Sequence, residues 1–500
     1  MKSTRLSWLD PQALARLTGG NWVNAPSADW HPQKICFHYD WAPHSLVIPK
    51  GQPFRHGLDL DDIDPAELEN CAMLVAERMV DPSGIPQLIV PSIDDAVESL
   101  AATARSRFTG TICAVTGSVG KSSTSHLIAH VLRRYGQCSP LRPGVNTKAG
   151  AIAQTINLHD EDFAIIEMSV GKGLQATEVV RPHLAILTAI APAHMTYAGP
   201  LPRLAQLKAR IFTGLESNGT AILNRNVPYF EKVQAVAKRH AGTTITYGEH
   251  DEADFRLLDY DRSQQLIHAE AYGHRLTYKL GVDGRHMAIN SLAVLSTLSA
   301  LGLDYKEGAS LLAGARGLIQ RGRSYSLRIS RRKVTLIDDS HNANPASMVA
   351  AFHLLAGYQG RRILVLGDML ELGQDEVAYH RDLVDPILDC KIDKVHVMGT
   401  LMAHLWDTLP GHIKGAKCDS AEGLREAVLA DLEDGDVVLF KGSHANMLWN
   451  LVKDLIKLNE TETKDNDTVR PRPFSRNVLR RVRRFSNVLQ RAARGLGSRT

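Results

Sequence analysis

The sequence lacks the patterns that mark several classes of protein. Its six cysteines are scattered and include no Cys-x-x-Cys pair, which argues against a zinc site or a disulfide framework and fits reduced thiols in a cytoplasm. No apolar run approaches the length of a membrane span, since Pro192 breaks the segment 183–193. The first ten residues lack the apolar core of a signal peptide. We therefore expect a soluble, cytoplasmic protein.

Acidic residues and lysines are missing from residues 468–500, a tail that carries ten arginines. The rest of the chain has 48 basic and 54 acidic residues, so its charge is −6, although the formal net charge of the whole chain is +4. Apolar residues of the tail fall on one helical stripe, and a basic amphipathic helix suits an anionic membrane surface. That would place the protein at the inner face of the membrane. A helix docked on its own protein and a disordered tail are the alternatives, and we expect no nucleic-acid partner.

The length of 500 residues predicts about three domains. Apolar runs of strand length alternate with helical patterns, which predicts an α/β protein with mostly parallel sheets. We expect an N-terminal domain at 1–108, a central domain at 109–325, a Rossmann-like C-terminal domain at 326–458 and a linker with the basic tail at 459–500. The expected strands lie at 46–48, 72–75, 87–90, 110–115, 164–168, 183–190, 334–340, 362–368, 394–398 and 436–440. The expected helices lie at 93–107, 125–135, 208–215, 286–301, 347–355 and 421–432.

The segment Thr116–Thr124 has the pattern of a phosphate-binding loop between a strand and a helix. Gly117 and Gly120 would let backbone N–H groups converge on an anion at the helix N-terminus. Lys121 can reach the terminal phosphates, and Ser122 can hold Mg²⁺. An ordinary glycine-rich turn is the alternative reading of this segment.

Two further polar residues follow predicted strands of the central domain. Glu167 ends one apolar run, and His194 comes shortly after the next. The carboxyl ends of parallel strands meet at one edge of a sheet, so we expect both side chains near the phosphate-binding loop.

Several motifs in order along residues 85–458 together resemble the Mur ligase family, which also carries a loop without the first glycine, here Val115. The motifs are Thr116-Gly-Ser-Val-Gly-Lys-Ser-Ser123, Glu167-Met168, Ala193-His194, Lys208 with Ile211-Phe212, Gly284-x-His286-x-x-x-Asn290, Arg321-Gly-Arg323, Asp338–Ser347, Leu366–Gly373 and Lys441-Gly-Ser443. Within the family the chain is most similar to the enzymes that join D-alanyl-D-alanine to UDP-N-acetylmuramoyl-tripeptide in peptidoglycan synthesis.

The resemblance implies an ATP-dependent acid–amino-acid ligase that forms ADP. A carboxylate attacks the γ-phosphate of ATP, and an amine then displaces phosphate from the acyl phosphate. Phosphoryl transfer of this kind requires Mg²⁺ and cationic side chains. The substrates would be small molecules: a carboxylate acceptor that is UDP-linked in the family, and an amino acid or dipeptide.

The resemblance also assigns roles to individual residues. The expected nucleotide-binding residues are Gly117, Ser118, Gly120, Lys121, Ser122, Ser123, Asn290, Arg323 and Asn342. The expected catalytic residues are Lys121, Glu167, His194 and Lys208, and the expected metal-binding residues are Ser122, Glu167, His194 and Lys208. The expected amine-binding residues are Asp368, Glu371, Lys441 and Ser443.

Lys208 is assigned by the resemblance alone. In the family the matching lysine is carbamylated by CO₂, which turns an ammonium into an anion that can hold Mg²⁺. The residues themselves would predict a solvated helix lysine. The Lys441-Gly-Ser443 turn likewise has an alternative reading as a plain strand-to-helix loop.

The departures from the family cluster at the substrate ends of the chain. Residues 35–41 lack the Asp-Ser-Arg motif that helps bind the uridine nucleotide, and the loop 49–55 is unlike the usual one. His341 and His444 stand where the family often has Tyr and Arg. Three hypotheses follow: the D-alanyl-D-alanine-adding ligase itself, a Mur-type ligase for another carboxylate and amine, such as one that decorates an envelope glycan or makes a small peptide, and a non-catalytic scaffold or plain NTPase. The intact phosphate machinery argues against the third.

Overall fold

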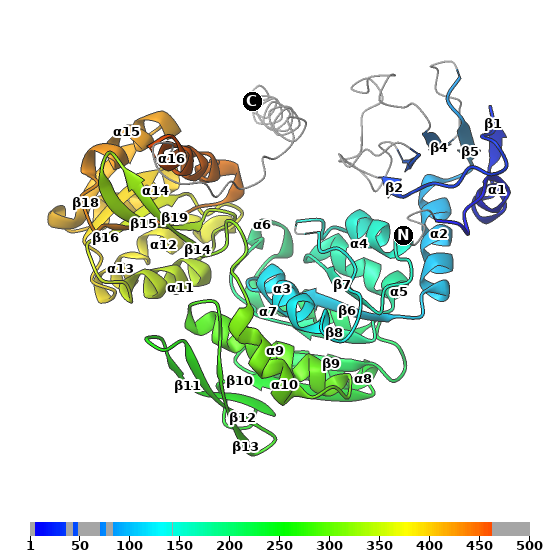
Figure 1. Ribbon diagram of the computed structural model, residues 1–500, viewed down its shortest axis with the longest axis horizontal. Coiled ribbons are helices and arrows are strands. Elements are labelled where there is room, and N and C mark those ends of the chain that lie inside the picture. Colours follow the sequence, from blue (N-terminus) through cyan, green and yellow to red (C-terminus); the bar gives the residue numbers. More distant parts are fainter. Residues whose placement is uncertain (1–5, 37–43, 49–70, 77–83, 143, 463–500) are drawn as a thin grey trace.

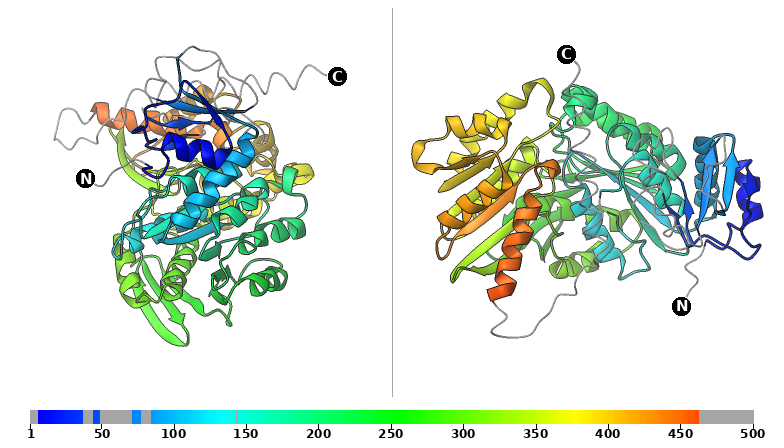
Figure 2. Two further views of the ribbon diagram at one scale, coloured as in Figure 1. Left: turned by 90° about the vertical axis from the view of Figure 1, so that its right-hand side faces the viewer. Right: turned by 90° about the horizontal axis from the view of Figure 1, so that it is seen from above.

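The computed structural model of the protein describes residues 6–36, 44–48, 71–76, 84–142 and 144–462. Three β-sheets succeed one another along the chain, and helices pack against each of them (Figure 1). Seen from above, the lobe built on the second sheet lies between the other two (Figure 2). The protein is therefore an α/β protein of three lobes, as the alternation of apolar and helical patterns predicts.

The first lobe has a five-stranded sheet in the order β1-β5-β4-β3-β2, parallel except for β1. Its strands are β1 (Asn21–Val23), β2 (Ile35–Cys36), β3 (Leu46–Val47), β4 (Ala72–Ala76) and β5 (Gln87–Val90). Its helices are α1 (Pro11–Thr18) and α2 (Ile93–Arg107). Helix α2 has the predicted bounds, and it starts there because the Ser92 hydroxyl accepts the Asp95 N–H and caps it.

Two polar side chains fasten the first lobe to the second. Arg105 of α2 is buried and donates to two backbone carbonyls at the end of α5 (Thr177–Val180) and, at 2.9 Å, to Glu216 Oε1. The amide of Asn157 accepts the Ile35 N–H at 2.8 Å and donates to the Ile35 carbonyl at 3.0 Å. Asn157 thus satisfies the N–H and the carbonyl of Ile35 on edge strand β2, as an additional strand would.

The second lobe has an eight-stranded sheet in the order β13-β12-β11-β10-β9-β8-β6-β7. Its strands are β6 (Thr111–Thr116), β7 (Phe163–Glu167), β8 (Leu184–Leu187), β9 (Thr220–Asn224), β10 (Thr243–Gly248), β11 (Phe255–Asp261), β12 (Leu266–Ala271) and β13 (His274–Lys279). Its helices are α3 (Lys121–Leu132), α4 (Lys148–Ile156), α5, α6 (Met195–Ala198), α7 (Leu201–Ala209), α8 (Phe230–His240), α9 (Arg285–Ala300) and α10 (Tyr305–Leu311), with short 3₁₀ turns η3 (Gly171–Ala176), η4 (Arg210–Phe212) and η5 (Leu312–Gly314).

The strands from β7 to β11 run parallel, and β12 and β13 extend the sheet in antiparallel pairs. Consecutive residues of β6 enter different cores: Ile112 and Ala114 pack with the first lobe, whereas Cys113 and Val115 pack under α3 and α9. Burial on both faces explains why the parallel strands read as continuous apolar runs.

The third lobe has a six-stranded sheet in the order β14-β15-β19-β16-β17-β18, parallel except for β14. Its strands are β14 (Arg323–Ile329), β15 (Arg332–Asp339), β16 (Arg362–Gly367), β17 (Lys394–Met398), β18 (Lys414–Cys418) and β19 (Val437–Lys441). Its helices are α11 (Pro345–Ala356), α12 (Glu376–Arg381), α13 (Val384–Asp389), α14 (Thr400–Thr408), α15 (Ala421–Asp431) and α16 (Leu448–Glu462), with 3₁₀ turns η6 (Gly373–Asp375), η7 (Gly411–Ile413) and η8 (His444–Asn446).

The structure corrects three expectations about these elements. The predicted boundary at 325/326 falls inside β14, which pairs with β15 along its whole length. The predicted linker at 459–467 is wrong at its start, because α16 continues to Glu462. Lys208 stands near the end of α7 and does not open a helix. The tail at 468–500 lies outside the described residues.

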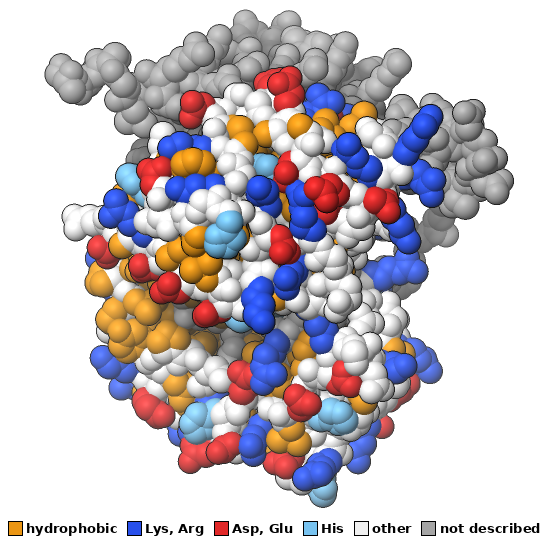
Figure 3. Space-filling view, turned by 90° about the vertical axis from the view of Figure 1, so that its left-hand side faces the viewer, with side chains coloured by type: hydrophobic (Ala, Val, Ile, Leu, Met, Phe, Trp, Pro, Cys, Tyr) orange, Lys and Arg blue, Asp and Glu red, His pale blue; other side chains and the backbone are white. Residues whose placement is uncertain are grey.

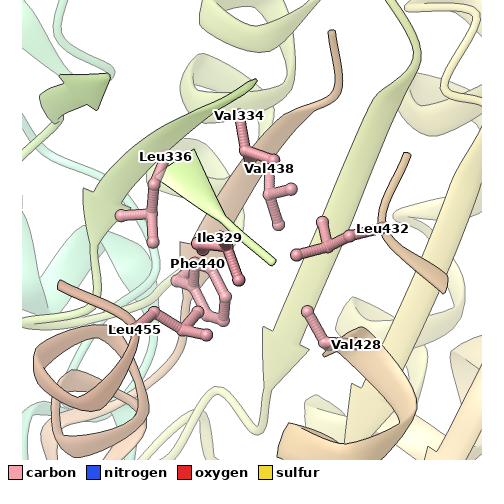
Figure 4. A pocket seen from close by; sticks show the side chains of 8 residues that line it. All are labelled: Ile329, Val334, Leu336, Val428, Leu432, Val438, Phe440 and Leu455. Carbon is pink, nitrogen blue, oxygen red and sulfur yellow. The ribbon is translucent and has the colours of Figure 1, made fainter. Parts of the chain in front are cut away.

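Eight apolar side chains line a small hollow in the third lobe (Figure 4). They are Ile329, Val334, Leu336, Val428, Leu432, Val438, Phe440 and Leu455. Because none of them offers a polar group, this hollow belongs to the packing of the sheet against α15 and α16.

Surface and thiol chemistry agree with the composition. All six cysteines are described and all are free thiols. Within the described ranges, no helix is long and apolar enough to cross a bilayer. Basic and acidic side chains are interspersed on the face that Figure 3 shows.

Candidate active site

The phosphate-binding loop joins β6 to α3 in a form that only glycine permits at two positions. A Cβ atom on Gly117 would lie 1.9 Å from Thr188 Oγ1. Gly120 caps α3 with a φ of 84°, and a Cβ atom there would lie 3.1 Å from the Asn290 amide oxygen. The loop therefore presents its backbone and the N-terminus of α3 to one side, as an anion site requires.

Ser118 holds the loop to the segment after β8. Its N–H donates to the Ala189 carbonyl at 2.7 Å, and its hydroxyl donates to the Ala191 carbonyl at 2.8 Å. Both polar groups of Ser118 thus serve the shape of the loop in this conformation. Ser123, also expected at the nucleotide, is half-buried in the first turn of α3.

Ser122 and Glu167 meet at the base of the loop. The Ser122 hydroxyl donates to Glu167 Oε2 at 2.7 Å, and the two residues are only 2% and 5% exposed. Two oxygen donors in this position fit Mg²⁺, which prefers oxygen ligands and keeps several waters or phosphate oxygens of its own. Among the described residues, no group of three or more His, Cys, Asp or Glu side chains could hold a metal.

Two lysines of this region, Lys121 and Lys208, influence each other electrostatically. Lys121 Nζ donates to the Gly117 carbonyl at 2.6 Å; burial lowers its pKa to about 8, an effect that Glu167 opposes. Lys208 is 1% exposed, and burial, followed by the charge of Lys121, lowers its pKa well below the usual range. Burial and the nearby charge of Lys121 thus both disfavour the ammonium form of Lys208.

His194 and Glu371 connect the second and third lobes. His194 Nδ1 lies 2.5 Å from Glu371 Oε2, and both backbones are left-handed, with φ values of 57° and 63°. The hydrogen bond from His194 lowers the pKa of the Glu371 carboxyl. The structure thus joins a residue expected at the metal to a residue expected at the amine.

The other residues expected at the amine support loops of the third lobe. Lys441 is 2% exposed and donates to Asp339 Oδ2 at 2.6 Å. Asp368 Oδ1 accepts the Met402 N–H at 2.8 Å in the first turn of α14. Ser443 Oγ accepts the N–H of Leu370, next to Glu371 in the chain, at 2.9 Å.

The residues expected at the far parts of the nucleotide are spread along the junction. Asn290 is buried against Gly120, whereas Asn342 is exposed and offers its carbonyl to Lys441 at 3.0 Å. Arg323 is exposed and stacks over the Tyr325 ring, with its guanidinium carbon 5.2 Å from the ring centroid.

Sequence analysis missed one charged residue of the site. Arg321 acts electrostatically on Lys121 and is itself influenced by Glu167 and Asp339. The available signal was the Arg-Gly-Arg motif, from which only the second arginine, Arg323, was chosen.

Comparison with known proteins gives the site a context. Residues 115–298 match the Mur ligase middle domain, and residues 323–444 match the Mur ligase, glutamate ligase domain. A UDP-N-acetylmuramoyl-tripeptide--D-alanyl-D-alanine ligase of Synechocystis is 30% identical over 404 residues, which are 78% of this chain and 84% of the relative. The ligase of the same name from Bacillus subtilis is 29% identical over 429 residues, which are 83% of this chain and 91% of the relative.

Solved structures agree on the fold. MurF from Acinetobacter baumannii matches with a TM-score of 0.77 and 23% identity, over 90% of this chain and 98% of that one. MurF ligase from Thermotoga maritima, solved in complex with ADP, matches with a TM-score of 0.72 and 22% identity, over 86% of this chain and 98% of that one.

Proposed function

Because the chain belongs to the Mur ligase family, we propose that it joins D-alanyl-D-alanine to UDP-N-acetylmuramoyl-tripeptide, with ATP as the energy source, in peptidoglycan synthesis. The observation that carries the proposal is the phosphate-binding loop with the Ser122–Glu167 pair at its base and Lys121 at its rim. The relatives that bear this name match about four fifths of the chain.

In the first step the substrate carboxylate attacks the γ-phosphorus of ATP, and the bond to the bridging oxygen breaks to release ADP. The N–H groups at the start of α3 and the Lys121 ammonium bind the phosphate oxygens. Ser122 and Glu167 would hold Mg²⁺, which supplies charge neutralisation on the β- and γ-phosphates when bound. Lys121 stays protonated beside an anion, because an opposite charge favours the charged form of a lysine.

Lys208 is carbamylated in this proposal. Its neutral amine attacks the carbon of CO₂ and loses a proton, which leaves a carbamate anion on the side chain. The support is physical: a buried lysine without a counter-ion is costly as a cation, whereas an anion at that point is stabilised by Lys121. The carbamate would then be a further oxygen ligand beside Glu167.

In the second step the amine of the dipeptide attacks the acyl phosphate carbon, and phosphate leaves from the tetrahedral intermediate. The His194–Glu371 contact supports an amine site at the lobe junction, since it brings a carboxylate of the third lobe to the edge of the second. The lowered pKa of Glu371 keeps it anionic at neutral pH, so it can bind an incoming ammonium. Asp368, Lys441 and Ser443 hold the surrounding loops.

The second hypothesis, another carboxylate and amine, rests on the altered uridine region, whose residues 37–43 and 49–70 lie outside the described part of the chain. The test is ADP formation by the full chain with UDP-N-acetylmuramoyl-tripeptide and D-alanyl-D-alanine, with each substrate omitted in turn and the product identified by mass. ADP that forms only with both substrates, together with the ligated product, supports the proposal. An absence of stimulation by the pair contradicts it and favours a different carboxylate or amine.

We propose in addition that the arginine tail binds anionic membranes and brings the enzyme to the inner membrane face. The support is the concentration of ten arginines in residues 468–500 beside a body with a charge of −6. Sedimentation of the full chain with phosphatidylglycerol vesicles, compared with a chain that ends at residue 467, tests this. Equal sedimentation of the two chains contradicts it.

A further inference from the structure

A buried histidine of the third lobe binds the backbone of the loop that carries Glu371. His380 lies on α12 and is 0% exposed. Its Nε2 atom accepts the Met369 N–H at 3.0 Å, and its Nδ1 atom lies 2.6 Å from the Glu376 carbonyl oxygen. Because a carbonyl oxygen can only accept a hydrogen bond, Nδ1 carries the proton and donates.

The two hydrogen bonds fix both the charge and the tautomer of His380. A neutral imidazole has one N–H and one acceptor nitrogen, and the two contacts use one of each. An imidazolium would offer two N–H groups and would leave the N–H of Met369, which is also 0% exposed, without this acceptor. Burial lowers the pKa of His380, although the hydrogen bond to Glu376 and the charge of Asp368 oppose the shift. His380 is therefore a neutral acceptor with a defined direction.

The residues on either side of Met369 are bound to other elements of the third lobe. The Asp368 carbonyl accepts the Ser443 N–H at 3.1 Å, and Asp368 Oδ1 accepts the Met402 N–H at 2.8 Å in the first turn of α14. Ser443 Oγ accepts the Leu370 N–H at 2.9 Å. Three consecutive residues, 368–370, are thus bound to α14, to α12 and to the segment after β19, and His380 supplies the middle attachment.

Glu371 follows directly and depends on these attachments. Its φ of 63° lies in the left-handed region, which a glutamate adopts only when its surroundings hold it there. Its Oε2 atom lies 2.5 Å from His194 Nδ1 of the second lobe. Asp368 is buried with its carboxylate bound to α14, whereas the Glu371 side chain is partly exposed. Glu371 is therefore the carboxylate of this loop that a ligand can reach.

We propose that His380 is a positioning residue, which acts through the Met369 backbone to hold Glu371 in place for His194 and for the ammonium group of the incoming amine. The inference rests on the proposed ligase function, because that function supplies the ammonium. The role belongs to the neutral imidazole as an acceptor, so a side chain that offers an acceptor at the place of Nε2 should replace it. Without that acceptor the loop loses its middle attachment, and the carboxylate is no longer held at the lobe junction.

The first experiment measures the loop without any substrate. Hydrogen exchange of peptides that cover residues 368–371 is followed by mass spectrometry in the full chain, in His380→Gln and in His380→Asn. The glutamine amide reaches the place of Nε2, whereas the shorter asparagine amide does not. We expect exchange in the loop to rise by on the order of 10-fold in His380→Asn and to stay near the parent value in His380→Gln.

The matched control for this experiment is His396→Asn. His396 lies on β17 of the same lobe, is 3% exposed and accepts the Ala416 N–H at Nδ1 at 3.1 Å, while its Nε2 atom lies 3.1 Å from Asp431. The same substitution there removes an equally buried imidazole that has its contacts elsewhere, so exchange at 368–371 should not change. Unchanged exchange in His380→Asn, or an equal rise in His396→Asn, overturns the proposal.

The second experiment uses turnover and separates the two substrates. His380→Asn should raise KM for D-alanyl-D-alanine by on the order of 10-fold, with changes below about threefold in kcat and in KM for ATP. His380→Gln should restore the dipeptide KM, and His396→Asn should leave it unchanged. An equal rise of KM for both substrates overturns the proposal, since a general loss of structure would act on both.

Two further outcomes are also decisive. If His380→Asn does not fold, His380→Gln alone decides: parent-like exchange and dipeptide KM support the proposal, and a loss in either overturns it. If the parent does not turn over the proposed substrate pair, the function proposed above fails, while the exchange experiment still decides whether His380 holds the Glu371 loop.

Discussion

The hydrogen bond between Ser122 and Glu167 makes the sharpest prediction about a single side chain. Glu167→Gln keeps the shape of the residue and removes the charge that a magnesium ion would meet, so kcat should fall by on the order of 10²–10³-fold. Glu178→Gln, an exposed change on α5, is the control. Steady-state ADP formation over a magnesium titration measures the effect. A Glu167→Gln enzyme with the kcat and magnesium dependence of the control would refute the assignment.

Lys121 predicts a proton uptake when nucleotide binds. Its pKa in the free protein is lowered to about 8, so above pH 8 a growing fraction is neutral, while bound phosphate favours the charged form. Calorimetric ADP titrations at pH 8.5 in buffers of different ionisation enthalpy should therefore show protons taken up. Lys121→Met should reduce this uptake, whereas Lys148→Met on α4 should leave it unchanged. Identical uptake in the Lys121→Met protein would contradict the lowered pKa.

Carbamylation of Lys208 would make the turnover of the enzyme depend on dissolved CO₂. Removal of dissolved CO₂ should lower the turnover, and bicarbonate should restore it in the parent enzyme but not in Lys208→Ala. A turnover that does not depend on CO₂ would contradict the carbamylation of Lys208.

Some residues of the site could be predicted from the sequence, and others could not. Ser122 and Glu167 could be predicted together because Ser122 follows the loop after β6 and Glu167 ends β7, the parallel strand beside β6. Arg321 was missed because its electrostatic effect on Lys121 depends on the turn of the chain into the third lobe, which no local pattern records. Asp368 and Ser443 were expected at the amine, but their hydrogen bonds to Met402 and Leu370 show that they also hold loops in place.

Among the elements, the junction of β11 with α11 carries a testable contact. Arg262, in the turn after β11, donates to Asp283 at 2.7 Å and to the Leu354 carbonyl near the end of α11 at 2.5 Å. A Cβ atom on Gly357 would lie 1.2 Å from Arg262 Nη1, although the φ of Gly357, −85°, suits any residue. Gly357→Ala should therefore destabilise the protein by about 1–3 kcal/mol through displacement of Arg262.

Denaturant unfolding of Gly357→Ala, Arg262→Ala and the double variant measures this coupling. The glycine change should cost much less in the Arg262→Ala background, because the displaced group is already gone. Additive losses would show that the alanine is rejected for another reason. Gly360→Ala is no suitable control, since its φ of 108° already disfavours a side chain.

The elements themselves were predicted best where caps and burial agree with the local pattern. Helix α2 has a side-chain cap and a clear apolar face, and its bounds were predicted correctly. Strand β14 was missed because its exposed positions carry Arg and Ser, which conceals its pairing with β15. The end of α16 was read as a linker because its last turns are polar, yet the helix continues through them.

For the whole molecule, the His194–Glu371 contact predicts that the second and third lobes respond to pH. The lowered pKa of Glu371 means that its bond to His194 is present above the usual carboxyl range and is lost as the pH falls through the lowered value. Small-angle scattering should show an expansion of the ligand-free protein on acidification. In Glu371→Gln the expansion should already be present at neutral pH and should not change further. A scattering profile of Glu371→Gln identical to that of the parent at neutral pH would contradict this role.

The arrangement of three lobes was predictable from length and alternation, and the family resemblance supplied their order. The contacts between lobes were not, because they join residues far apart in the chain, such as Asn157 with Ile35 and Arg262 with Leu354.

Strand β14 has one more consequence, at the rim of the third sheet. The exposed face of this edge strand carries Ser324, Ser326 and Arg328 at alternate positions. The Asn459 Oδ1 atom accepts the Arg328 N–H at 2.7 Å. Charge and an occupied donor both discourage a strand of a second molecule from pairing there. Because Asn459 belongs to α16, this helix also occupies part of the strand edge and disfavours pairing with a second molecule.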